Sequence, residues 1–217
     1  MDADDRLTAD LARALDASFE AVVLAHQDRI YTIALRMLGD PRDAEEAAQD
    51  AFVRAYRALT TYEPARIREL RLRGWLSTIV LNGCRSNVSR RAAHGATPRP
   101  LDGPEGTSLD PGTLASAGPA AIVERRHERE AWASRLAALP MAYRSAVVLR
   151  HVDGLSYPEA AAALGRPEGT VKAQVHRGIA LLRTMLEAEA EAEAQVQVRA
   201  SLAMESRVLP EPQELSA

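Results

Sequence analysis

Residues 155–186 read LSYPEAAAALGRPEGTVKAQVHRGIALLRTML and carry helical periodicity on both sides of one break, at residues 165–167. Ser156 followed three residues later by Glu159 is typical of a capping box, in which the two residues satisfy the free N–H groups at a helix start. Gly165 tolerates the left-handed conformation that often ends a helix. The stretch therefore predicts two consecutive helices joined by a short turn.

The second of these helices has one apolar face and one basic face. Its apolar residues recur at spacings of four, four, three and four and form one stripe: Val171, Val175, Ile179, Leu182 and Leu186. Lys172 and His176 project on the opposite side, with Arg177 on its flank. A helix anchored in this way, with short and basic side chains near its N-terminus, suits the major groove of DNA. An ordinary helical hairpin has the same pattern, so the motif alone leaves both interpretations open.

The composition predicts an all-α protein. The chain has 217 residues, of which 47% are hydrophobic and 4% aromatic, and its commonest residues favour helix over strand. Cys84 is the single cysteine, which excludes an internal disulfide and a cysteine-rich zinc site. The N-terminus lacks a signal-peptide pattern, and no apolar stretch approaches the roughly 18 residues of a membrane span. We expect a soluble cytoplasmic protein without membrane insertion.

The charge is unevenly distributed along the chain. Residues 1–20 hold six acidic residues and two arginines, and residues 187–217 hold seven acidic residues and two arginines. The overall charge of −3 therefore conceals a net +6 over residues 21–186. A basic centre between acidic ends is compatible with a polyanionic partner.

Changes in composition divide the chain into two small helical domains on a flexible linker. The linker is rich in Pro, Gly, Ser and Thr and has no apolar period. A helical extension at the C-terminus lacks an apolar stripe, which favours a mobile tail. The first domain is predicted at residues 19–91, the linker at 92–119 and the second domain at 120–186. An acidic N-terminal segment (1–18) precedes them, and an acidic tail (187–217) follows.

A helix predicted within residues 38–59 carries acidic residues early and basic residues late. Asp43, Glu46 and Asp50 precede Arg54, an order that suits the helix dipole and allows pairs four residues apart. From these residues alone, a self-paired face exposed to solvent is the favoured interpretation.

Three stretches together carry a resemblance to a known family. They are RIYTIALRMLGDPRDAEEAAQDAFVRAYRAL (29–59), RGWLSTIVLNGCRSNVSRR (73–91) and ALPMAYRSAVVLRHVDGLSYPEAAAALGRPEGTVKAQVHRGIALLR (138–183). Their order resembles bacterial extracytoplasmic-function (ECF) sigma factors of the two-domain sigma-2/sigma-4 type. The resemblance covers the first domain and the second, helix-turn-helix domain.

The resemblance implies a sigma factor without catalytic chemistry, metal or cofactor. Such a protein binds core RNA polymerase at the beta-prime clamp and the beta flap, recognises the −35 and −10 elements of promoter DNA, and helps to melt the duplex. It would act in a stress or signal response under an anti-sigma factor. This overturns the solvent-face interpretation of the acidic helix.

Matching positions imply three sets of binding residues. The polymerase-binding set is Asp43, Glu46, Gln49 and Asp50. The −10 DNA-binding set is Arg71, Arg73, Trp75, Asn82, Arg85, Arg90 and Arg91. The −35 DNA-binding set is Arg150, Thr170, Lys172, Ala173, His176 and Arg177.

Some positions depart from the family's usual pattern. Ala173 and Gln174 stand where the family often has Ser and Arg, Ile179 replaces an Arg, and Ser86 stands where Asp is common. Fewer phosphate contacts imply a shallower salt dependence of DNA binding. Two other classes remain open from the residues: a stand-alone helix-turn-helix regulator that binds DNA as a dimer, and an adaptor or anti-sigma protein acting only through protein contacts.

Overall fold

The computed structural model describes residues 3–93, 128 and 131–207. The regular structure of these residues is helical, and they contain no strand, which confirms the all-α prediction. Chain contacts form two compact units that divide between residues 179 and 180, within the last helix. The predicted linker, apart from residues 92 and 93, lies outside the described residues.

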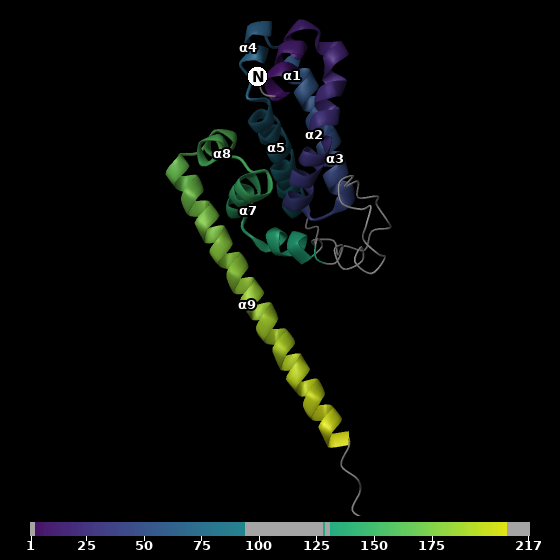
Figure 1. Cartoon of the computed structure of the whole chain (residues 1–217), viewed down its shortest axis with the longest axis vertical. Coiled ribbons are helices and arrows are strands. Elements are labelled where there is room, and N and C mark those ends of the chain that lie inside the picture. Colours follow the sequence, from purple (N-terminus) through teal and green to yellow (C-terminus); the bar gives the residue numbers. More distant parts are fainter. Residues whose placement is uncertain (1–2, 94–127, 129–130, 208–217) are drawn as a thin grey trace, which may run out of the picture. The chain divides into compact units, whose positions relative to one another are not determined.

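The N-terminal half, residues 3–93, is a helical bundle (Figure 1). Its helices are α1 (Ala3–Arg13), α2 (Leu15–Leu38), α3 (Pro41–Leu59), α4 (Pro64–Arg68) and α5 (Leu72–Ala93). Helices α2, α3 and α5 pack against one another, and α1 packs against α2 and α4.

Local sequence explains the sharp turn between α2 and α3. Gly39 ends α2 with a φ of 78°, a left-handed conformation that favours glycine. Asp40 then caps α3, because its side chain accepts hydrogen bonds from the backbone N–H groups of Arg42 and Asp43. Pro41 occupies the first helical turn, where its missing N–H costs no hydrogen bond.

The core of the N-terminal half combines small residues of α3 with larger ones of its neighbours. Alanines at 44, 48, 51 and 55 are buried on α3, so α2 and α5 can approach closely. Ile30, Met37, Leu76 and Val80 fill the space between them. Leu11 of α1 is 1% exposed and belongs to the same core. Helix α1, within the predicted acidic N-terminal segment, therefore packs onto this half through Leu11.

Cys84 lies in this core and is buried. Burial raises the pKa of its thiol to about 12, because a thiolate is costly to form away from water.

We therefore expect Cys84 to be unreactive in the folded protein. Iodoacetamide at pH 8 should modify it slowly, and denaturation in guanidinium should accelerate the reaction by orders of magnitude, measured by mass spectrometry. Equal rates in the folded and denatured protein would contradict this burial.

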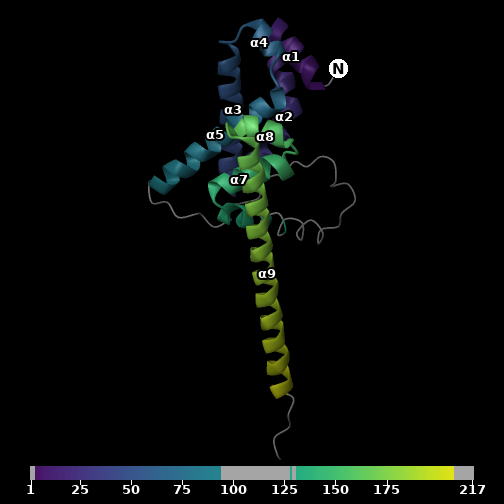
Figure 2. The same cartoon turned by 90° about the vertical axis from the view of Figure 1, so that its left-hand side faces the viewer.

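The C-terminal half, residues 131–179, carries the predicted helix-turn-helix. Residues 131–138 are helical, followed by α7 (Met141–Val147), the π-helical turn η1 (Val148–Val152), α8 (Tyr157–Leu164) and the start of α9 (Glu168–Arg207) (Figure 2). The predicted helix-turn-helix is α8 and α9.

The capping box is present at the start of α8. Glu159 accepts a hydrogen bond from the Ser156 backbone N–H at 2.9 Å, and the Ser156 hydroxyl accepts one from the Glu159 N–H at 3.4 Å. Gly165 ends α8 with a φ of 61°. Val171 and Val175 of the predicted apolar stripe are buried. Both halves of the motif therefore fold as their sequence indicates.

Gly178 sets the distance between α9 and α7. A Cβ atom at this position would lie 2.6 Å from Val147 Cγ2 and 3.4 Å from Tyr143 Cβ, and Val147 is itself buried. The absence of a side chain therefore permits the helices to pack closely.

Replacing Gly178 by alanine should destabilise the protein, because overpacking costs about 1–3 kcal/mol and exceeds the gain in helix propensity of roughly 1 kcal/mol. Gly83→Ala is the matched control, since nothing lies within 4 Å of a Cβ there, and it should be stabilising. Thermal unfolding followed by circular dichroism measures both. A rise in Tm for both variants would contradict the close packing at Gly178.

The last helix is longer than its apolar stripe. The described part of the predicted acidic tail, residues 187–207, continues α9, and residues 208–217 lie outside the described residues. Val196 and Val198 are 68% and 59% exposed. None of the described helices is both long enough and apolar enough to span a bilayer.

Candidate nucleic-acid interface

The predicted polymerase-binding residues of α3 occupy two environments. Glu46, Gln49 and Asp50 are exposed, and Asp50 forms an ion pair with Arg54 at 3.3 Å. The side chain of Asp43 is only 14% exposed and forms an ion pair with Arg91 of α5. Asp43 is therefore committed to a contact within the bundle, whereas the other three present their side chains to solvent.

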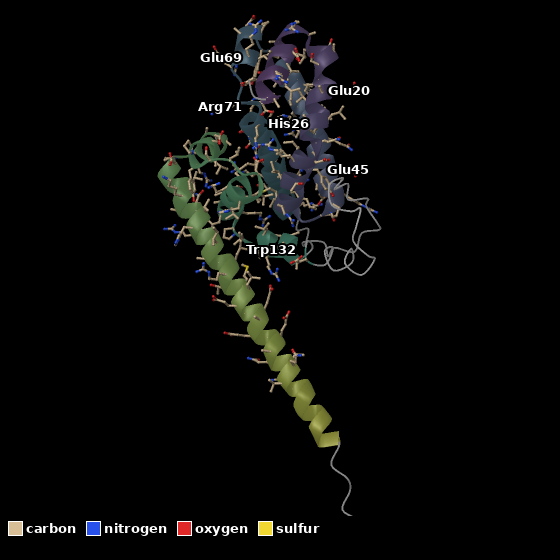
Figure 3. The ribbon with its side chains drawn as sticks, viewed as in Figure 1. Glu20, His26, Glu45, Glu69, Arg71 and Trp132 are labelled. Atoms are coloured by element: carbon tan, nitrogen blue, oxygen red, sulfur yellow. The ribbon has the colours of Figure 1, made fainter. Side chains whose placement is uncertain are left out.

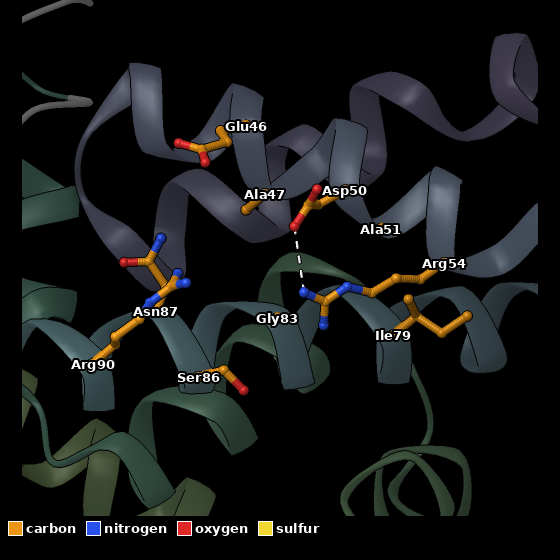
Figure 4. A pocket seen from close by; sticks show the side chains of 10 residues that line it. All are labelled: Glu46, Ala47, Asp50, Ala51, Arg54, Ile79, Gly83, Ser86, Asn87 and Arg90. Atoms are coloured by element: carbon orange, nitrogen blue, oxygen red, sulfur yellow. Dashed lines mark hydrogen bonds and ion pairs between the residues drawn. The ribbon is translucent and has the colours of Figure 1, made fainter. Parts of the chain in front are cut away.

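A shallow groove of about 200 Å³ runs between α3 and α5 (Figure 4). The α3 wall includes Glu46, Asp50 and Arg54, and the α5 wall includes Asn87 and Arg90. Carboxylates of the predicted polymerase-binding set thus share one groove with an arginine of the predicted −10 set. Ser86, at the position where the resemblance leads one to expect Asp, also lines the groove.

The predicted −10 residues of α5 are distributed around the helix. Asn82 and Arg90 are exposed, whereas Arg91 is paired with Asp43. Arg73 donates a hydrogen bond to the backbone carbonyl of Asp153 in the C-terminal half. The structure does not gather these residues on one open surface.

Arg85 is half-buried on the side of α5 that faces the C-terminal half. Burial lowers the pKa of its guanidinium, and the nearby positive charge of Arg166 lowers it further. Its Nη2 atom is buried without a hydrogen-bond partner. Arg85 is therefore only partly open to a partner in this arrangement.

Arg71 lies at the start of α5 (Figure 3). Its side chain is 86% exposed, and its Nη1 atom lies 3.8 Å from Glu159 of α8. Hydrogen bonds from Ser156 lower the pKa of Glu159, and the positive charges of Arg71 and Arg73 add to this effect. An exposed pair of this kind contributes little to stability, so Arg71 remains free to exchange this contact for a phosphate.

Trp75 belongs to an aromatic and cationic cluster near α4. Its ring is partly buried and lies 6.1 Å from the ring of Tyr62, and the Arg66 guanidinium sits 3.8 Å from the Tyr62 centroid. Such a cluster can stack on an unpaired base. The predicted −10 set, which followed the positions that match the family, did not include Tyr62 and Arg66. An aromatic residue followed by several arginines is the sequence signal that could have identified them.

The predicted −35 residues of α9 form one open row. Thr170, Lys172, Ala173, His176 and Arg177 are all exposed on the first turns of the helix. Lys172 Nζ lies 2.6 Å from Glu168, and this hydrogen bond raises the pKa of the lysine. Lys172 and Arg177 both lie in the N-terminal part of α9, as a recognition helix requires.

Arg150 reaches the same region from η1. Its guanidinium lies 5.1 Å from the centroid of the Tyr157 ring, and Lys172 Nζ lies 5.5 Å from that centroid. Tyr157 thus links two predicted −35 residues. The sequence did not single it out, because a tyrosine in the first turn of α8 reads only as part of a helix start.

Among residues 3–93, 128 and 131–207, no cluster of His, Cys, Asp and Glu is arranged to hold a metal ion.

Each half of the chain matches a known protein family model. Residues 22–94 match the family model for sigma-70 region 2, and residues 129–182 match that for sigma-70 region 4. Together these matches define the chain as a protein of the sigma-70 class.

Similarity to individual sigma factors identifies the family within this class. The ECF sigma factor SigW of Bacillus subtilis is 30% identical over 78% of this chain and 89% of its own length. The sigma factor CnrH of Cupriavidus metallidurans is 33% identical over 87% of this chain and 96% of its own length. SigE of Mycolicibacterium smegmatis is 34% identical over 78% of this chain, and the match spans 62% of that protein. The chain belongs to the ECF family of RNA polymerase sigma factors, as the sequence resemblance indicated.

Solved structures agree with this assignment. CnrH in complex with the cytosolic domain of CnrY has a TM-score of 0.62 and 30% identity, and covers 86% of this chain and 99% of that one. The sigma factor RpoE of Bartonella quintana, in complex with the anti-sigma factor NepR, has a TM-score of 0.57 at 22% identity and shows the shared fold. The matches support a sigma factor rather than a stand-alone regulator.

Proposed function

We propose that this chain is the subunit that directs core RNA polymerase to a promoter with defined −35 and −10 elements. The observation that carries the proposal is the open row on α9, Lys172, Ala173, His176 and Arg177, in a half that matches sigma-70 region 4. The first turns of such a helix place side chains at base edges in the major groove.

Helix α3 is the surface that we assign to the polymerase. Glu46, Gln49 and Asp50 are exposed on one side of it, and that side presents a row of carboxylate and amide groups. Such a row would suit a basic surface on the beta-prime clamp. Asp43 supports this surface from inside the bundle through its pair with Arg91.

The −10 element would meet the exposed parts of the N-terminal half. Arg71, Asn82 and Arg90 offer hydrogen-bond donors to phosphates, and Trp75 with Tyr62 and Arg66 offers a platform for a base that leaves the duplex. Trapping unpaired bases in this way would offset the cost of unstacking them, which is a few kcal/mol per base.

An anti-sigma factor is the regulatory partner that we infer. Both structural neighbours are described as complexes, one with the cytosolic domain of CnrY and the other with an anti-sigma factor. This partner and the polymerase would meet the chain in the cytoplasm. The role is one of binding and positioning, without catalysis by the chain itself.

In vitro transcription with core RNA polymerase and a promoter library tests the assignments. Arg177→Ala should reduce the yield from the preferred −35 sequences by about tenfold, since one good base contact contributes about 1–3 kcal/mol. The matched control is Arg199→Ala, an exposed arginine further along the same helix, which should leave the transcripts unchanged. Equal transcript profiles from the two variants would reject the −35 assignment.

Asp50→Ala should instead weaken binding to core polymerase without changing which promoters are chosen. We expect a loss of about tenfold in affinity, as for a typical charged hot-spot residue, measured by competition against a labelled sigma factor. Asp28→Ala, which removes an exposed carboxylate from α2, serves as the control. An Asp50→Ala affinity equal to that of the control would reject α3 as the docking surface.

A further inference from the structure

Asp153 is a buried carboxylate that its own half does not satisfy. It follows η1, and its side chain is 0% exposed. Within the described residues, the hydrogen-bond and ion-pair partners of this carboxylate all belong to α2 and α5 of the N-terminal half. A buried carboxylate is stable only when charged or polar groups surround it, so its placement reports a specific contact between the halves.

Arg29 of α2 binds this carboxylate with two nitrogens. Its Nε atom lies 2.5 Å from Asp153 Oδ1, and its Nη2 atom lies 3.0 Å from Oδ2. Two-pronged contacts of a guanidinium with a carboxylate combine charge with geometric specificity. Both partners are largely removed from water, with the Arg29 side chain 19% exposed.

Two residues of α5 complete the cluster. The Ser77 hydroxyl lies 2.8 Å from Asp153 Oδ2 and accepts a hydrogen bond from Arg29 Nη2 at 2.6 Å. Arg73 donates to the Asp153 backbone carbonyl and lies 3.7 Å from Oδ1. We call these four residues, Arg29, Arg73, Ser77 and Asp153, the Asp153 cluster.

A second contact attaches the halves about two turns further along α2. The buried Arg144 of α7 donates to the backbone carbonyl of Met37 at 2.6 Å, in the last turn of α2. A cation at the C-terminal end of a helix is favoured by the exposed carbonyls and the helix dipole. Residues 29 and 37 are about 12 Å apart along α2, so α7 and η1 lie against α2 at two separate points.

The covered face of α5 carries two arginines, Arg73 and Arg85, of the −10 set that the sequence resemblance implied. Arg73, Ser77, Leu81 and Arg85 recur every four residues and therefore share one side of α5. Ser77 and Leu81 are fully buried, Arg73 contacts Asp153, and Arg85 is half-buried beside Arg166. The contact between the halves therefore covers part of this face, with the Arg73 side chain left 48% exposed.

We propose that the Asp153 cluster is an intramolecular latch, in which the C-terminal half occupies the arginine face of α5 and competes with promoter DNA for it. The free chain would then bind DNA weakly, and docking on polymerase would open the latch by separating the two halves. The competition with DNA rests on the proposed function, whereas the contact itself does not.

The same interface contains features that limit the stability of the latch. Arg85 and Arg166 bring like charges together, and Arg29 Nη1 and Arg85 Nη2 are buried without hydrogen-bond partners. Unsatisfied buried donors and like charges both disfavour the closed arrangement. These unfavourable terms offset part of the stabilisation by the Asp153 cluster, as expected for a contact that opens.

The first test measures the distance between the halves in the free full-length chain. Spin labels on Glu20→Cys and Ala162→Cys, both exposed positions, report it by pulsed electron resonance, and the buried Cys84 stays unlabelled. We expect one narrow distance in this background and a broad distribution once Asp153→Asn or Ser77→Ala is added. A broad distribution without these changes, or an unaltered narrow one with them, would overturn the latch.

The second test measures binding of a fluorescein-labelled single-stranded DNA to the free chain by anisotropy. Asp153→Asn should tighten binding by about tenfold, because opening the latch raises the fraction of binding-competent molecules. Asp28→Asn changes the net charge equally at an exposed site of α2 and should match the wild type. Equal affinities for the two variants would overturn the competition, even if the distances had changed.

The two tests separate the latch from the proposed function. Both use the chain without polymerase, so a failure to bind polymerase would reject the proposed function and leave the distance result intact. Circular dichroism of Asp153→Asn and Ser77→Ala checks that both variants are folded. Ser77→Ala acts from the opposite side of the contact, so agreement between the two variants excludes a local defect after η1.

Discussion

Different sides of helix α5 contact the core of the N-terminal half, the C-terminal half and solvent, and this division constrains the rest of the structure. Leu76, Val80 and Cys84 are buried in the core of the N-terminal half. The side marked by Arg73, Ser77 and Arg85 meets the C-terminal half, and the remaining side, with Asn82 and Arg90, is exposed. Because each residue advances about 100° around the helix, these sides are distinct, and in the latch that we propose the C-terminal half competes with DNA for the arginine side.

Charge complementarity links α5 to α3 in the same way. Asp43 is paired with Arg91, and the groove between the helices sets Glu46 and Asp50 opposite Arg90. Whatever docks on α3 therefore changes the field around the C-terminal turn of α5. The polymerase surface and the DNA surface that we assign to this half are neighbours that share an electrostatic environment.

The sequence predicted features that depend on local chemistry, and it missed those that depend on distant partners. The capping box at Ser156 and the helix end at Gly165 follow from a few adjacent residues, and the exposed row on α9 follows from one helical period. Asp153 was unpredictable, because after a helix it reads as an ordinary turn residue, while its partner Arg29 lies 124 positions away. The helical periodicity likewise predicted that Asp43 is an exposed acidic residue, because a pattern within one helix does not show that Arg91 of another helix lies beside it. The resemblance supplied the functional class but not the accessibility of its residues.

The position of the Asp153 side chain depends on the number of residues in the π-helical turn η1, and not only on which residues they are. The Asp153 N–H bonds to the carbonyl of Val148, five residues earlier, where a regular α-helix would use the fourth. A π-turn is equivalent to one residue inserted into an α-helix. Without that extra residue the helix would rotate the carboxylate by roughly a quarter turn, so that a deletion anywhere in residues 148–152 would realign the segment as effectively as replacing the aspartate. In a related protein, inserting or deleting one residue in this turn could therefore create or remove the contact between the halves. All four side chains of the Asp153 cluster would still be present.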